Sequence, residues 1–150
     1  MIPKGAEGIG HIATRIAVDL MPKAADAYAG ADMGLIATLL GLVAQDYDRA
    51  ADNLVADHAD IASILREAQP HLTDASLRRR AEAAASATCQ TLRVHDLAAR
   101  GDIEMRVLID LHETVEKAMD EGAAWAHALN ARIWRFLDEY VARRTYQSAF

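Results

Sequence analysis

The stretch DMGLIATLLGLVAQDYDRAADNLVADHADIASILREA, residues 32–68, decides the fold predicted for this chain. It contains no proline, so nothing in it forbids a continuous helix on steric grounds. Its apolar side chains recur at steps of three and four residues, the spacing of one face of an α-helix. These positions are Ile36, Leu40, Val43, Tyr47, Ala50 and Leu54, followed after a shift by Ile61, Leu65 and Ala68. The pattern predicts one helix on the order of 55 Å long, which needs partners of comparable length.

The sequence before this stretch predicts two shorter helical segments. Residues 8–20 place four apolar side chains at helical spacing, namely Ile9, Ile12, Ile16 and Leu20. Pro22 is predicted to open a second segment over residues 23–29, which Gly30 ends. Asp32 is then predicted to be the N-cap of the long helix.

The longest apolar run, residues 33–44, lies at the start of the long helix. It is shorter than the roughly 20 residues needed to span a bilayer. We therefore predict a buried helix here, in preference to a membrane-surface or partner-binding role, and no membrane span. Residues 1–10 have no apolar core of the kind found in a signal peptide.

The sequence after residue 68 predicts two further helices. Residues 69–73 form a turn, and Thr73 is predicted to cap a third helix. Arg100, Gly101 and Asp102 supply a cation, a C-terminal glycine and an N-cap, and so predict the corner where that helix ends. The seam of the third helix is Leu77, Ala81, Ala84, Thr88, Leu92, His95 and Ala99.

The fourth helix is predicted over residues 103–140, and Gly122 either bends it or splits it. Short corners make consecutive helices antiparallel neighbours. The predicted fold is therefore all-α: an antiparallel bundle of about four main helices, two of them unusually long, in a single domain over residues 1–150. The aromatic residues of the C-terminal part are either the packing anchor of this bundle or an oligomer contact, and they are Trp125, Trp134, Phe136, Tyr140, Tyr146 and Phe150.

The composition limits the classes of function. Hydrophobic residues make up 52% of the 150 residues and aromatic residues only 5%, which is typical of a helical core rich in alanine and leucine. The formal charge of −6 argues against a protein that binds nucleic acid by neutralising phosphates. Cys89 is the single cysteine, so an intramolecular disulfide is excluded and a cytoplasmic location is predicted.

Counting along the predicted antiparallel helices gives one candidate site. From the predicted turns, His58, Cys89 and His112 fall at the same height in the bundle. Glu116 lies one turn beyond His112 on the same helix face, and Asp57 adjoins His58. Imidazole, thiolate and carboxylate groups are ligands for zinc or iron, so this layer is a candidate transition-metal site. The alternative is a buried polar layer whose histidines are hydrogen-bonded to carboxylates.

Other site patterns have less support. A ferritin-like di-iron site needs Glu-x-x-His pairs, and none of the six histidines has a glutamate three residues before it. The pair His95-Asp96 resembles that of helical metal-dependent phosphohydrolases, which would make His71 and Asp110 or Asp120 further ligands. The segment from Arg106 to His112 resembles the Arg-spacer-His element of HEPN ribonuclease domains. Each resemblance covers only a few residues, so the sequence identifies no family.

Charge is distributed unevenly along the predicted helices. The long helix carries five aspartates between residues 46 and 60, whereas the third helix opens with Arg78, Arg79 and Arg80. Cations at a helix N-terminus oppose the helix dipole and need compensation. Ion pairs with acidic neighbours or binding of an anionic ligand or acidic partner would each supply it.

Two functional hypotheses follow from these patterns. The first is association, as a homo-oligomer or with a protein partner, through the long amphipathic helices and the aromatic C-terminal part. The alternative is an enzyme or binding protein with a metal or small ligand held inside the bundle by His58, Cys89, His112 and Glu116. The sequence does not decide whether the protein is an enzyme.

Overall fold

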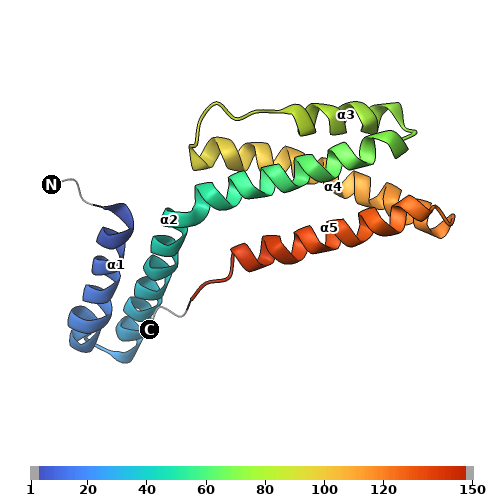
Figure 1. Ribbon diagram of the computed structural model, residues 1–150. Helices are drawn as coiled ribbons and strands as arrows, with labels where there is room; N and C mark the ends of the chain where they lie inside the picture. Colours follow the sequence, from blue (N-terminus) through green and yellow to red (C-terminus); the bar gives the residue numbers. More distant parts are fainter. Residues whose placement is uncertain (1–3, 148–150) are drawn as a thin grey trace. The chain divides into compact units, whose positions relative to one another are not determined.

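The computed structural model describes residues 4–147, and over that range it contains five α-helices and no strand (Figure 1). The helices are α1 (Gly5–Arg15), α2 (Ala27–Ala68), α3 (Ala75–Ser86), α4 (Val94–Asp120) and α5 (Ala124–Arg143). A π-helical turn (Ile16–Leu20) and a 3-10 turn (Met21–Lys23) follow α1, and a second 3-10 turn (Gln69–His71) follows α2. The all-α prediction is confirmed, but the α-helices number five instead of about four.

The chain divides into two compact units. The first, which we call the hairpin unit, consists of residues up to 50 together with those from 146. The second, the core unit, consists of residues 51–145. Helix α2 contributes to both units. The single domain over residues 1–150 stays a prediction.

In the hairpin unit, α1 begins at Gly5, three residues earlier than predicted. A Cβ atom at Gly5 would lie 2.4 Å from the Tyr47 ring of α2, so a larger residue here would require that ring to move. The Lys4 ammonium also pairs with the Glu7 carboxylate at 3.0 Å in the first turn. Helix α1 therefore begins in close contact with α2.

Helix α2 begins five residues before the predicted cap. The Asp26 carboxylate accepts a hydrogen bond from the Ala29 amide at 2.8 Å, which is the contact of an N-cap. The predicted segment over residues 23–29 and its end at Gly30 are wrong, because α2 runs through both Gly30 and Asp32. Asp26 lies closer to Pro22 than Asp32 does, and it has the capping role that was predicted for Asp32.

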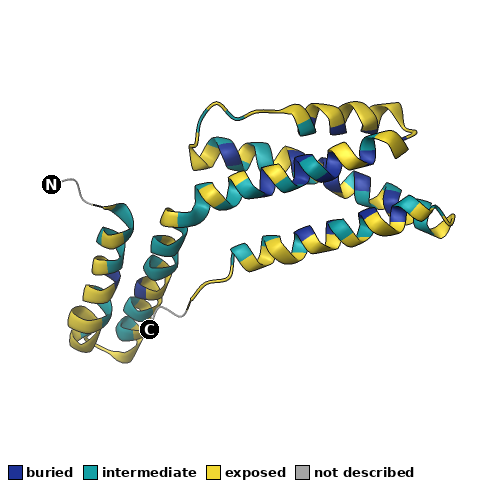
Figure 2. Cartoon of the chain, in the orientation of Figure 1, coloured by how far each residue is buried: buried dark blue, intermediate teal, exposed yellow. Residues whose placement is uncertain are grey.

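Small residues line the contact between α1 and α2. Ala13 is 3% exposed and Ala37 is fully buried, and a Cβ at Gly34 would touch the Met21 sulfur at 3.4 Å. Ala37 is the only buried residue among residues 33–44, and Figure 2 shows mostly intermediate and exposed residues along this part of α2. The prediction of a buried helix over residues 33–44 is therefore wrong for the single chain, since the other residues of this stretch are intermediate or exposed.

The hydrophobic core lies in the core unit, where α3, α4 and α5 alternate in direction (Figure 1). The predicted periodicities of α2 beyond Ala50, and of most of α4 and α5, are confirmed by burial. The buried members of the core are Ile61, Ile64, Leu65, Ala68, Leu72, Leu77, Ala81, Ala84, Val107, Leu108, Leu111, Val115, Ala126, Leu129, Ile133 and Phe136. Among the aromatic side chains Phe136 acts as a packing anchor, Trp134 is 53% exposed, and Phe150 lies outside the described residues.

The third helix is much shorter than predicted. Helix α3 is capped by Asp74 instead of Thr73, since the Asp74 carboxylate accepts from the Ser76 amide at 2.6 Å. It ends at Ser86, and residues 87–93 form an extended linker with two threonines, a residue type that favours helix poorly. The corner predicted at Arg100, Gly101 and Asp102 is wrong because these residues lie inside α4.

Gly122 splits the predicted fourth helix. Its φ of +81° lies in the left-handed region, where a glycine is favoured. Its amide donates to the Met119 carbonyl and the Ala123 amide donates to the Ala118 carbonyl, both at 2.9 Å. This is the Schellman pattern that ends a helix, so α4 stops at Asp120 and α5 begins at Ala124.

Candidate functional site

Three polar or charged residues are buried in the described part of the chain: Asp57, His58 and Glu104. All three belong to the core unit. Asp57 and His58 are neighbours on α2, and Glu104 lies on α4. Buried charged groups are rare unless they are paired, so these three residues are candidates for a functional site.

The Glu104 carboxylate holds two partners at once. It is 1% exposed, and its Oε2 lies 2.5 Å from His58 Nδ1. Its Oε1 accepts from Arg100 Nε at 2.6 Å, one helical turn earlier on α4. An ionised carboxylate only accepts, so this pairing favours the His58 tautomer that carries its proton on Nδ1. Glu104 thus fixes the orientation of the imidazole and leaves Nε2 for another partner.

Asp57 makes a separate ion-pair cluster with the end of α5. Its two carboxylate oxygens lie 2.7 Å from the Arg143 guanidinium and 2.5 Å from that of Arg144. Arg143 also pairs with Asp60 at 2.5 Å. The hydrogen bond to Asp60, with that to Asp57, raises the pKa of Arg143 against the opposing effect of burial. Asp57 and Asp60 of α2 are therefore compensated from the end of α5 and not by the arginines of α3.

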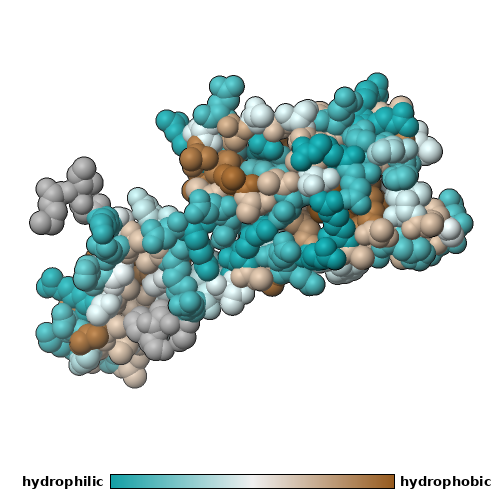
Figure 3. Space-filling view, viewed as in Figure 1, coloured by the Kyte–Doolittle hydropathy of each residue, from teal (hydrophilic) through white to brown (hydrophobic). Residues whose placement is uncertain are grey.

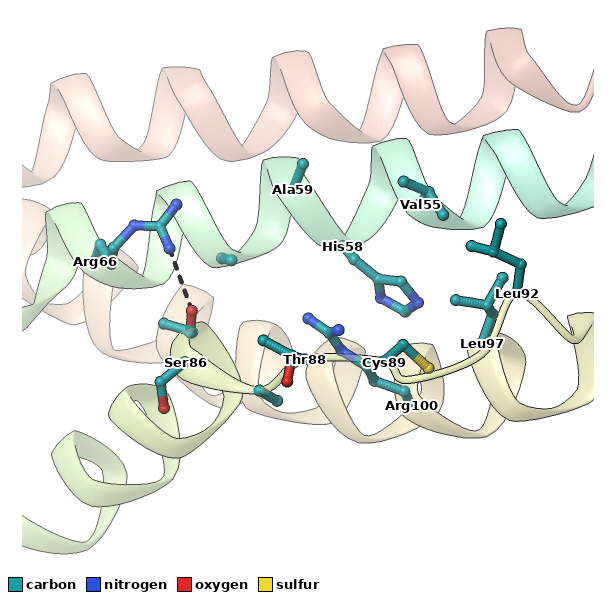
Figure 4. Close-up of a pocket in the computed structure, with 13 residues that line it drawn as sticks. Val55, His58, Ala59, Arg66, Ser86, Thr88, Cys89, Leu92, Leu97 and Arg100 are labelled. Atoms are coloured by element: carbon teal, nitrogen blue, oxygen red, sulfur yellow. Dashed lines mark hydrogen bonds between the residues drawn. The ribbon is translucent and has the colours of Figure 1, made fainter.

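A pocket of about 560 Å³ lies beside His58 in the core unit (Figure 4). Its walls come from α2, the end of α3, the 87–93 linker and α4. The volume falls within the range of about 300–1,000 Å³ typical of small-molecule sites. The lining residues with polar or ionisable groups are His58, Arg66, Ser86, Thr88, Cys89 and Arg100.

The imidazole of His58 has one nitrogen without a partner. His58 is 5% exposed, and its Nε2 is buried without a hydrogen bond. Figure 4 shows the ring turned toward the linker that carries Cys89, with Leu97 on the same side. A buried polar atom without a partner costs about 1–3 kcal/mol, so a ligand that bonded to Nε2 would recover that energy.

The four predicted metal ligands do not converge. His58 and Cys89 line the same pocket, but His112 Nε2 bonds to Asn130 Oδ1 of α5 at 2.9 Å. Glu116 lies 3.7 Å from His112 and is 62% exposed. Within residues 4–147 no group of three or more His, Cys, Asp or Glu side chains is arranged to hold a metal ion.

The wrongly predicted corner at residues 100–102 explains why the residues of the predicted layer lie apart. With α4 continuous through Gly101, His58 lies opposite Gly101 and Glu104. His112 is eight residues beyond Glu104, about 12 Å along the helix axis. The inference that polar groups interrupt the core at His58 is confirmed, whereas the placing of His112 at the same height is wrong.

Sequence reasoning missed Glu104 and Arg100. Glu104 occupies a core-facing position of α4, seven residues after Leu97 and seven before Leu111, all three of which are buried. A carboxylate in an apolar heptad position, with an arginine four residues before it, is a signal for a buried ion pair. The signal was hidden because the prediction began a new helix at residue 103.

The ligands implied by the phosphohydrolase resemblance also lie apart. The His71 ring stacks on Trp125 with ring centroids 4.4 Å apart, and Asp110 pairs with Arg80 at 2.5 Å. Arg78 donates to the Leu72 carbonyl. Two of the three arginines of α3 therefore have acceptors within the core unit.

Comparison with known proteins assigns no family: no family model, no curated protein and no solved structure matches this chain.

One helical stretch, Ala27–His71, is long and apolar enough to cross a membrane by length and composition. In its most apolar 18-residue window only 6% of the residues are buried.

Proposed function

We propose that this protein acts by association, and that two copies pair through the hairpin unit. The observation that supports this proposal is a set of large apolar side chains on α2 that residues 4–147 leave exposed. We call them the α2 stripe: Leu35, Ile36, Leu39 and Val43, which are 57%, 43%, 51% and 51% exposed.

The α2 stripe lies on the side of α2 that faces away from α1. An α-helix turns by about 100° per residue, so Leu39 and Ala37 are separated by about 160° around the axis. Ala37 is fully buried, whereas Leu39 is half exposed. Because α1 already occupies the small-residue side, a further helix has to cover the stripe.

The hairpin unit buries little apolar surface by itself. Ala13 and Ala37 are its buried residues in the described part of the chain, and an alanine side chain contributes only one methyl group. Fixing the backbone costs about 1–2 kcal/mol per residue, so two helices that meet through alanines need additional burial. Two hairpins packed through their stripes would form a four-helix arrangement and supply it.

The chemistry of the stripe favours a second copy over a membrane or a charged partner. Residues 33–45 carry no charge, so the best complement is another uncharged apolar face. A symmetric dimer provides that face with no further component. Insertion of the hairpin into a bilayer would carry Asp19, Lys23 and Asp26 at its turn into the hydrocarbon, which is costly. The single cysteine fits the predicted cytoplasmic location of such a dimer.

Light scattering after size-exclusion chromatography tests this proposal. The wild-type chain should elute as a dimer, and Leu39→Glu should elute as a monomer because it buries an unpaired charge at the stripe. Ile109→Glu is the matched control, since Ile109 is 61% exposed on α4 in the core unit, and it should remain dimeric. A wild-type monomer, or a chain that floats with phosphatidylcholine vesicles through the stripe, would overturn the proposal.

A further inference from the structure

We propose that the 560 Å³ pocket beside His58 binds a small organic anion, with a carboxylate or phosphate head and a short apolar tail. This inference goes beyond association through the hairpin unit. It rests on the charge of the pocket, its apolar wall and the unpartnered nitrogen of His58.

The ionisable groups of the pocket favour an anion. Arg66 and Arg100 both line it, and no carboxylate does. Arg66 donates to the neutral Ala85 carbonyl at 3.2 Å, so its charge is not cancelled there. Arg100 shares Glu104 with His58, and Glu104 lies behind the pocket lining. The charge of Arg100 is therefore compensated by Glu104, and Arg66 gives the pocket a net positive charge in a chain with a formal charge of −6.

The wall on the other side of the pocket is apolar. Its apolar lining residues are Val55, Ala59 and Ala62 of α2, Leu97 of α4 and Leu92 of the linker, and Figure 4 shows Val55, Leu92 and Leu97 together at one end of the pocket. Leu92 is 71% exposed and Val94 is 48% exposed, and Figure 3 shows an apolar patch where the linker meets the start of α4. An apolar tail placed along this wall would be shielded from water by side chains that are otherwise incompletely covered.

His58 and the linker supply the remaining polar contacts. Nε2 of His58 is buried and unpartnered, and its ring is turned toward Cys89 and Leu97 (Figure 4). In its protonated form the imidazole donates from Nε2 to an anion while Nδ1–H still donates to Glu104. Thr88 and Cys89 of the linker add a hydroxyl and a thiol to the lining.

Cys89 makes the test specific to this pocket, because it is the only thiol of the chain and lines the cavity. We would measure the rate at which iodoacetamide alkylates it, with hexanoate or hexyl phosphate as the probe. A bound probe should slow alkylation by a factor of 1 + [L]/Kd, about tenfold at ten times Kd. Hexanamide tests the need for a charge, and acetate tests the need for a tail.

The variants decide whether the pocket itself is responsible. Arg66→Gln should abolish protection by the probe, because it removes an exposed cation of the pocket that has no role in the buried Glu104 cluster. Arg79→Gln makes the same change of charge on the exposed surface of α3 and should keep protection. The proposal is supported if hexanoate or hexyl phosphate protects Cys89 in the wild type and in Arg79→Gln but not in Arg66→Gln. The proposal fails if neither anion protects, if hexanamide or acetate protects equally well, or if Arg66→Gln remains protected.

Discussion

At the scale of single residues, Glu104 is the centre of the core unit's polar cluster. It accepts hydrogen bonds from Arg100 and from His58 while only 1% of it is exposed. A buried ion pair contributes little net stability when it is intact, because desolvation offsets the attraction between its charges. Removing one member costs much more, because the others stay buried without a partner.

Glu104→Gln should therefore destabilise the core unit by on the order of 3 kcal/mol, since it leaves the Arg100 charge uncompensated. Urea denaturation followed by circular dichroism measures this loss. Glu113→Gln is the matched control, because Glu113 is 67% exposed and pairs only with exposed Lys117. It should leave the midpoint unchanged, and an equal loss in both variants would contradict the importance we assign to Glu104.

Tyr146 gives the hairpin unit a dependence on alkaline pH. Its hydroxyl donates to Asp46 at 2.7 Å, and this hydrogen bond, aided by desolvation, raises the pKa of Tyr146. A raised pKa means that the stabilisation is complete below the ordinary tyrosine pKa of about 10 and is lost as pH rises through the folded value. Absorbance titration at alkaline pH should show one late-ionising tyrosine that is missing in Tyr146→Phe.

At the scale of helices, Gly101 and Gly122 show that one residue type has opposite effects in two places. Gly101→Ala should be neutral or stabilise the protein by up to about 1 kcal/mol, because the added Cβ meets His58 at an ordinary 3.6 Å inside a helix. Gly122→Ala should destabilise it by about 1–2 kcal/mol, because φ is +81° there. Thermal melting of the two variants separates them, and a shift in the same direction would contradict our account of the α4–α5 turn.

The start of α2 can be tested in the same way. Asp26→Ala should cost about 1 kcal/mol of helix stability, because the Ala29 amide loses its acceptor. Hydrogen exchange at the Ala29 amide should accelerate in this variant. Asp32→Ala should leave that exchange unchanged, because Asp32 lies within α2 and caps nothing there.

The periodicity of apolar residues predicted where helices occur more accurately than the glycines and capping residues predicted where they end. The seams around Ile61, Leu111 and Ile133 are buried as expected, because burial depends on a repeat that many residues share. Helix ends depend on single residues, and Gly30 and Gly101 both lie inside helices. A glycine marks an end only where the backbone adopts a left-handed conformation, as at Gly122.

The candidate site was predicted only in part, because its residues were placed by counting from the predicted helix ends. His58 and Cys89 do line one pocket, because the turn after α2 was placed within a few residues of its true position. Glu104 and His112 were misplaced because their heights were counted from a corner that does not exist. The unpartnered Nε2 of His58 depends on three-dimensional contacts, and no sequence pattern would show it.

At the scale of the whole molecule, the proposed dimer should respond to salt in an unusual direction. In an antiparallel two-fold pairing centred on Leu39, Asp32 lies beside the partner's Asp46, since both bracket the α2 stripe. Salt screens this repulsion within a Debye length of about 8–10 Å and leaves the apolar contact intact. Sedimentation equilibrium should therefore show a tighter dimer as sodium chloride is raised, and a weaker one would contradict the antiparallel pairing.

The cluster of Glu104, His58 and Arg100 also constrains how the protein can change by mutation. No member can be exchanged alone without leaving a buried charge or donor, but an apolar set of similar volume at all three positions would remove the problem. Viable sequences should therefore carry the three polar residues together or lose them together. A related sequence that kept the fold but lost the function of the pocket would replace all three residues together. The joint loss of Glu104, His58 and Arg100 would then indicate that ligand binding was no longer under selection.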